Sequence, residues 1–122
     1  MTYNQKLEET KDYYPFDNWL QAFDDGLEQY TSENCGRTKA VFDTLISQLI
    51  RIGENAPENE KLALFKTAVL ALNALNEEID DLIETGERED LCDLIDHITI
   101  AAGLMPGKYG DGDGLADEWR EW

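Results

Sequence analysis

Residues Glu77–Asp96 read EEIDDLIETGEREDLCDLID, and this stretch decides how the chain folds. Apolar residues recur at helical spacing on both sides of a Thr85-Gly86 break, namely Ile79, Leu82, Ile83, Leu91, Leu94 and Ile95. The same stretch holds one base, Arg88, and these acidic residues: Glu77, Glu78, Asp80, Asp81, Glu84, Glu87, Glu89, Asp90, Asp93 and Asp96. We therefore expect the tip of an antiparallel helix pair, apolar on its inner side and densely anionic on its outer side.

The helices on either side of this break extend the tip into a long αα-hairpin. Pro57, followed by Glu58 and Glu60, is typical of a helix start. One apolar face then continues for about 27 residues, roughly 40 Å of helix, through Leu62, Phe65, Val69, Leu72, Leu75, Ile79, Leu82 and Ile83. The second helix carries Leu91, Leu94, Ile95, Ile98 and Ala102 and ends at Gly103. A short connection predicts that the two helices are antiparallel neighbours.

Two further helices are predicted before the hairpin. The first has an apolar stripe formed by Phe16, Trp19, Leu20, Phe23, Leu27 and Tyr30, and its opposite face carries Asp17, Asp24, Asp25 and Glu28. Thr31 or Ser32 suits the N-cap of the second helix. A loose stretch over Asn34-Cys35-Gly36 is expected between this cap and the apolar stripe of the helix. Its stripe comprises Val41, Phe42, Leu45, Ile46, Leu49 and Ile52, and Gly53 ends it.

The two ends of the chain are short and polar. Residues 1–13 fit either a short helix or an extended arm, and the Tyr14-Pro15 step ends that segment because the residue before a proline avoids the helical region. Residues 104–122 form a glycine-rich tail. In it Asp113 suits an N-cap, and Leu115, Trp119 and Trp122 recur at helical spacing. We expect a short terminal helix that lays its two tryptophans on the bundle.

These elements define an all-α protein without an alternating β pattern or an internal repeat. The chain has 122 residues, of which 42% are hydrophobic, which suffices for one core but not for two domains. The prediction is a single domain over residues 1–122: a bundle of four to five helices with a long central αα-hairpin and a short C-terminal helix.

The net charge of -17 restricts the partners of the protein. Nucleic acids and anionic membranes are bound by basic surfaces, so we expect neither. A strongly acidic surface instead favours a basic protein or a metal ion. The alternative is that the charge only keeps the protein soluble, which explains scattered acids better than clustered ones.

The compartment is predicted from cysteines and from apolar runs. Cys35 and Cys92 are the only cysteines, and one distant pair is not a disulfide framework, so we expect two reduced thiols. The N-terminal residues have no basic-then-apolar run of the signal-peptide type, and no apolar run approaches the length of a membrane span. A cytoplasmic protein is the resulting expectation.

The acids of the hairpin tip give the first candidate site. Helical geometry turns Glu77, Asp81 and Glu84 away from the face of Leu72, Leu75 and Leu82, so these carboxylates point outward. Crowded like charges cost free energy that a cationic partner offsets. We therefore predict a partner-binding surface for a basic protein, with its charge supplied by Glu78, Asp81, Glu84, Glu87, Asp90 and Asp93.

The same acids admit a metal-dependent alternative. The pairs Glu78/Asp81 and Asp93/Asp96 resemble, in spacing, the acidic motifs of MazG-type nucleotide pyrophosphohydrolases. That resemblance implies a divalent-metal enzyme on a helical fold. A metal site in a bundle needs carboxylates that project inward, whereas these are expected to project outward. The principal prediction therefore remains a protein without catalytic residues or cofactors.

Aromatic residues at Asp12-Tyr13-Tyr14-Pro15 give the second candidate site. Tyr13 and Tyr14 lie outside the apolar stripe of the following helix, and tyrosines are frequent interface anchors. A small acidic helical chain with a Tyr-Tyr-Pro step resembles the colicin-type nuclease immunity proteins, whose tyrosine pair follows the acidic helix rather than preceding it. The resemblance implies inhibition of a cognate basic toxin domain. Immunity proteins of contact-dependent toxins and phage-encoded inhibitors that mimic DNA have the same physical profile.

The glycine-rich tail gives a third candidate. Asp111, Asp113 and Asp117 resemble part of an EF-hand or thrombospondin type 3 calcium loop, with Gly114 at its sixth position. In that register Tyr109 occupies the first position and Arg120 the twelfth, where carboxylates are required. A calcium-binding module is thus an alternative to a simple turn. His97, the only histidine, is expected to be partly exposed and without a catalytic role.

Overall fold

A computed structural model describes residues 1–24, 26 and 30–122 of the protein, and this part of the chain contains helices and turns but no strand. The all-α prediction is therefore confirmed. The α-helices are α1 (Tyr3–Glu9), α2 (Phe16–Asp24), α3 (Ser32–Ile52), α4 (Glu58–Glu78), α5 (Thr85–Ala101) and α6 (Ala116–Trp119). Short 3-10 turns are η1 (Thr10–Tyr13), η2 (Pro106–Lys108) and η3 (Gly110–Gly112).

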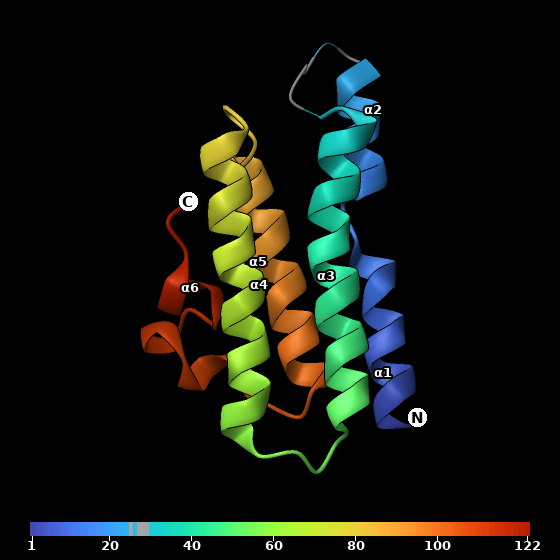
Figure 1. Ribbon diagram of the computed structural model, residues 1–122, viewed down its shortest axis with the longest axis vertical. Coiled ribbons are helices and arrows are strands. Elements are labelled where there is room, and N and C mark those ends of the chain that lie inside the picture. The colour runs from blue at the N-terminus through green and yellow to red at the C-terminus, as the bar shows by residue number, and fades with distance from the viewer. Residues whose placement is uncertain (25, 27–29) are drawn as a thin grey trace.

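The helices form an elongated bundle around one core (Figure 1). α3 and α4 run antiparallel and make the most extensive helix contact, and α5 returns antiparallel to α4. α1 and α2 lie along α3, whereas the C-terminal turns and α6 lie on the other side of α4. The largest fully buried side chains are Phe42, Phe65, Leu7, Leu45, Ile46, Leu49, Leu72, Leu82, Leu91, Leu94, Ile95 and Ile98.

The N-terminal segment is helical. Thr2 and Gln5 form a capping box, in which the Thr2 hydroxyl accepts from the Gln5 N–H and the Gln5 side chain accepts from the Thr2 N–H. Tyr3 and Leu7 are buried, which ties this helix to the bundle. Tyr14 is extended (φ -61°, ψ 127°) before Pro15, and α2 begins at Phe16, as the proline predicted.

The position of Tyr30 and the start of α3 depart from the prediction. α2 is described to Asp24, and Tyr30 is outside any helix, although the stripe predicted a helix to that residue. The predicted helix positions Asp25, Leu27 and Glu28 lie outside the described residues. The prediction of a loose stretch over residues 34–36 was wrong, because Thr31 caps the helix early: its hydroxyl accepts from the Asn34 N–H at 3.0 Å and α3 begins at Ser32.

The predicted break at Thr85-Gly86 was also wrong. α4 ends at Glu78, residues 79–84 form the turn, and Thr85 opens α5. Asn76 and Glu84 explain the shift, because the Asn76 side chain accepts from the Ile83 N–H at 3.0 Å and Glu84 forms a capping box with Glu87. α4 is consequently about 30 Å long rather than 40 Å.

The helix ends at glycines were predicted correctly. Gly53 and Gly103 end α3 and α5 with φ of 87° and 86°. Asp113 is not the N-cap of α6, because Leu115 occupies that position. Trp119 and Trp122 are partly buried and pack against the core, as expected.

Two further expectations concern membranes and thiols. Across the described ranges, no helix combines the length and the apolar character needed to cross a bilayer. Cys35 is buried, Cys92 is half-buried, and both are free thiols. Burial raises the pKa of both thiols above the ordinary value, which favours their protonated form.

Candidate functional site

Carboxylates gather where α4, the 79–84 turn and the start of α5 meet. We call this region the acidic end. Its exposed members are Glu77, Glu78, Asp80, Asp81, Glu84, Glu89 and Asp90, and Glu87 is half-buried. Asp81 sits in the turn with a positive φ of 59°, a conformation that Asp tolerates better than most residues. The expected exposure is therefore found for all members except Glu87, although Asp80, Asp81 and Glu84 lie in the turn and not on a helix.

Some of these acids have partners within the protein. The Arg37 guanidinium on α3 donates to both Glu78 carboxylate oxygens, at 3.1 and 2.6 Å, and thereby holds the pKa of Glu78 below its usual range. Glu84 and Glu87 are engaged in the capping box of α5. Within the described residues, no hydrogen bond or ion pair involves the side chains of Glu77, Asp80, Asp81 or Glu89, so these four carry the free charge of the acidic end.

One face of α5 continues the anionic surface away from this end. The Trp19 indole N–H on α2 donates to the Asp90 carboxylate at 3.2 Å. One turn further on, the Asp93 carboxylate lies 3.5 Å from His97 Nε2. The ring of Tyr13 stacks on His97 with 3.8 Å between centroids and 10° between planes. Two of the predicted contact residues, Tyr13 on η1 and Asp93 on α5, thereby share His97 as a neighbour.

Tyr14 lies elsewhere. It is half-buried, its hydroxyl donates to the Asp43 carboxylate at 2.8 Å, and its ring meets Phe16 edge-on at 5.2 Å. Burial first, and then the hydrogen bond to Asp43, raise the pKa of this phenol. The two tyrosines separate because Tyr14 is extended before Pro15, so neighbouring side chains leave the backbone in different directions. Tyr13 is 53% exposed.

A hollow of about 240 Å³ opens beside the Tyr13–His97 stack. We call it the Tyr13 hollow. Its walls comprise Met1, Lys6, Glu9, Thr10, Tyr13, His97, Ile100 and Ala101. Met1 and Ile100 are 72% and 61% exposed, which is high for apolar side chains. Two features of the sequence could have indicated this site. Asp93 and His97 are one helical turn apart, and Ile100 lies outside the apolar stripe of α5.

The carboxylates of the phosphohydrolase alternative are not brought together. Glu78 is turned to Arg37 on α3, Asp93 lies by His97, and Asp96 is half-buried with its oxygen against Gly114, where an added Cβ would be 2.5 Å away. Asp81 lies in the turn. Among the described residues, no three His, Cys, Asp or Glu side chains are placed to hold a metal ion.

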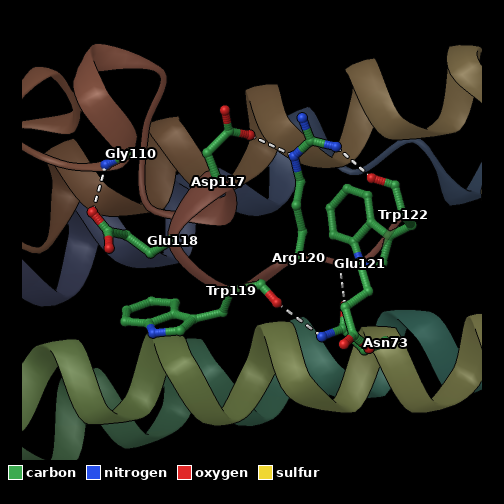
Figure 2. Close-up of polar contacts among 8 residues, drawn as sticks. All are labelled: Asn73, Gly110, Asp117, Glu118, Trp119, Arg120, Glu121 and Trp122. Carbon is green, nitrogen blue, oxygen red and sulfur yellow. Dashed lines mark hydrogen bonds and ion pairs between the residues drawn. The ribbon is translucent and has the colours of Figure 1, made fainter.

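Asp111, Asp113 and Asp117 do share a hollow, of about 300 Å³, with Gly110 and Glu118. Asp117, however, pairs with Arg120, and Glu118 accepts from the Gly110 N–H at 2.6 Å (Figure 2). Their carboxylates therefore hold the tail together, and the metal-binding geometry expected of a calcium loop is not formed in this part of the chain.

The tail itself is anchored on α4. The buried Asn73 amide donates to the Trp119 carbonyl and accepts from the Glu121 N–H, both at 2.9 Å (Figure 2). Arg120 donates to Asp117 and to the Trp122 carbonyl. The C-terminal tryptophans are thus packed against the bundle.

The chain matches no protein-family model, no curated protein and no solved structure. Its function is consequently inferred from the chemistry of its surface.

The environment of Asp96 leads us to expect that the stability of the protein depends on pH. Burial first, and then the charge of Asp93, raise the pKa of Asp96 above its ordinary 3.8. The folded state therefore binds this proton more tightly than the unfolded state does. The free energy of unfolding consequently falls as the pH rises from the unfolded-state pKa of Asp96 through its folded-state pKa. Asp96→Asn should be more stable than wild type at neutral pH, and the difference should shrink as the pH falls to about 4.

Urea unfolding at a series of pH values measures this effect. Asp113→Asn, at an exposed carboxylate of the tail, is the matched control for the loss of one negative charge. Equal pH profiles for Asp96→Asn and wild type would show that Asp96 titrates as in the unfolded chain.

Proposed function

We propose that the protein is an acidic binding protein that neutralises a basic protein, and more narrowly an immunity protein that inhibits a nuclease-type bacterial toxin. The observation that carries this proposal is the position of Tyr13, an exposed aromatic residue that stacks on His97, the neighbour of Asp93 on the anionic face that leads to the acidic end. Charge surrounding an exposed aromatic residue is the arrangement of a protein interface with a central anchor.

The acidic end has the electrostatic character that such a task requires. Like charges crowded on one surface repel each other, and a cationic partner removes that repulsion. Complementary potentials also raise the rate of encounter, and this effect weakens as salt screens it. A nuclease presents a basic cleft to its nucleic acid substrate, so an anionic surface that covers this cleft blocks the substrate.

The predicted contact residues contribute unequally. Asp81 and the unpaired acids around it supply free charge, whereas Glu78 is already paired with Arg37. Tyr13, with Asp90 and Asp93 on the neighbouring face of α5, supplies buried area and orientation. Tyr14 is engaged with Asp43, so we assign it to the core instead.

A charge-matched pair of variants tests the proposal. The acidic-end variant carries Glu77→Gln, Asp80→Asn, Asp81→Asn and Glu89→Gln. The control variant carries Glu54→Gln, Glu60→Gln, Asp111→Asn and Asp113→Asn, at exposed positions outside the acidic end. Both variants have the same net charge, so any difference between them reports on the position of the charge.

The partner is sought by retaining basic proteins from the source cell on the immobilised chain at low salt and eluting them with salt. A retained protein counts in favour only if it degrades nucleic acid and wild-type chain inhibits it. The acidic-end variant should then associate about tenfold more slowly at low salt, with the gap closing at high salt. If association slows equally in both variants, the effect comes from net charge alone, and the acidic end is not a specific binding surface.

A further inference from the structure

We propose that the Tyr13 hollow recognises arginine: the guanidinium of an arginine in the basic partner stacks on Tyr13 while its methylenes fill the hollow. This inference rests on the proposed function and names the side chain that the surface selects. It predicts a preference for arginine over lysine at this one position.

The geometry of the ring stack supplies the platform. One face of the Tyr13 ring lies flat on His97, and Tyr13 is nevertheless 53% exposed and lines the hollow, so part of this residue remains accessible to a partner. His97 lies on α5, which packs against η1, so the platform is held between two elements of the bundle. A planar guanidinium stacks on such a face, and a held ring loses little conformational entropy when it does so.

The charges around the platform favour a cation. Glu9 lines the hollow, Asp12 is exposed next to Tyr13, and the Asp93 side chain is 71% exposed beside His97. Lys6 and Met1, which carries the N-terminal ammonium, also line the hollow. Glu9 in the lining, with Asp12 and Asp93 beside the ring pair, gives three carboxylates against these two ammonium groups, so the site is net negative. The carboxylate oxygens suit the forked donors of a guanidinium.

The apolar wall distinguishes an arginine from a free cation. Met1 and Ile100 expose apolar surface next to the ring, and an arginine covers such surface with its methylenes while its head stays at the carboxylates. A lysine also has methylenes, but its compact, strongly hydrated ammonium gains less from the aromatic face. The expected selectivity therefore comes from Tyr13.

Oligo-arginine and oligo-lysine peptides of equal length are the probes, titrated into the full chain by calorimetry. Wild type should bind oligo-arginine about three times more tightly than oligo-lysine. Tyr13→Ala should lower the affinity for oligo-arginine and bring the ratio toward one, whereas Tyr13→Phe, which retains the ring, should keep it. Thermal melts of each variant establish that it is folded.

His97 provides a readout that is independent of affinity. It is the only histidine of the chain, so its imidazole gives a single set of NMR signals. Oligo-arginine should shift these signals more than oligo-lysine in wild type and much less in Tyr13→Ala. Unshifted His97 signals, or a ratio that Tyr13→Ala leaves unchanged, would overturn the arginine site.

The two proposals fail in different ways. If wild type binds both peptides equally and the acidic-end variant binds both more weakly, the result supports the anionic binding surface and contradicts the arginine site. If neither peptide binds wild type at low salt, the proposed function itself is contradicted, and the arginine site falls with it.

Discussion

Phe42→Ala should lower the free energy of unfolding by about 3–5 kcal/mol, because it removes a fully buried ring and leaves a cavity. Phe42 is 0% exposed on α3, with its ring centroid 5.9 Å from Phe16 and 6.3 Å from Tyr14. Phe16 in turn meets Trp19 edge-on at 5.3 Å. The substitution therefore weakens the contact that joins α2 and the Tyr14 segment to α3.

Urea unfolding followed by circular dichroism measures this loss as a lower midpoint at an unchanged slope. Leu70→Ala, at a side chain that is 46% exposed on α4, is the control and should cost less than about 1 kcal/mol. A comparably small effect for Phe42→Ala would mean that the aromatic cluster does not hold α2 in place.

Lys61→Met should lower the free energy of unfolding by about 2–4 kcal/mol, because two carbonyls lose a charged donor in a buried place. Lys61 is 5% exposed, and its Nζ donates to the Glu54 and Ala102 carbonyls, both at 2.8 Å. The ammonium also lies 5.1 Å from the centre of the Tyr3 ring. One side chain thus joins the α3–α4 loop, the end of α5 and α1.

The matched control is Lys66→Met, at an exposed position on the same helix, which should change stability by less than about 0.5 kcal/mol. Burying an ammonium is itself costly, so the substitution removes a desolvation cost as well as two hydrogen bonds, and the expected loss is the difference between the two. A Lys61→Met variant as stable as wild type would show that the two carbonyls find other donors and that the lysine does not hold the three elements together.

The sequence predicted local structure best where one short-range interaction decides it. Thr31, Gly53 and Gly103 cap helices, and Tyr14-Pro15 interrupts one, because each effect acts within a turn of the chain. The hairpin turn was misplaced because Thr85-Gly86 has a weak preference against helix. The Glu84–Glu87 capping box and the Asn76–Ile83 hydrogen bond outweigh that preference.

The candidate site was predicted in part. The anionic outer side of the hairpin follows from helical periodicity, which turns polar residues away from an apolar face. Which acids keep free charge does not follow, since Glu78 pairs with Arg37, 41 positions earlier in the chain. His97 and Ile100 were not proposed as contact residues, because the sequence does not show that the N-terminal segment lies against them.

The sequence by itself determined an all-helical, strongly anionic chain, since helical periods and charge are properties of residues a few positions apart. Only the tertiary structure decided that Tyr13 and His97 share a surface while Tyr14 enters the core. The physical reason is that η1 and α5 meet through packing of the whole bundle. Contacts over such separations depend on how every apolar face is buried at once, and no local pattern encodes them.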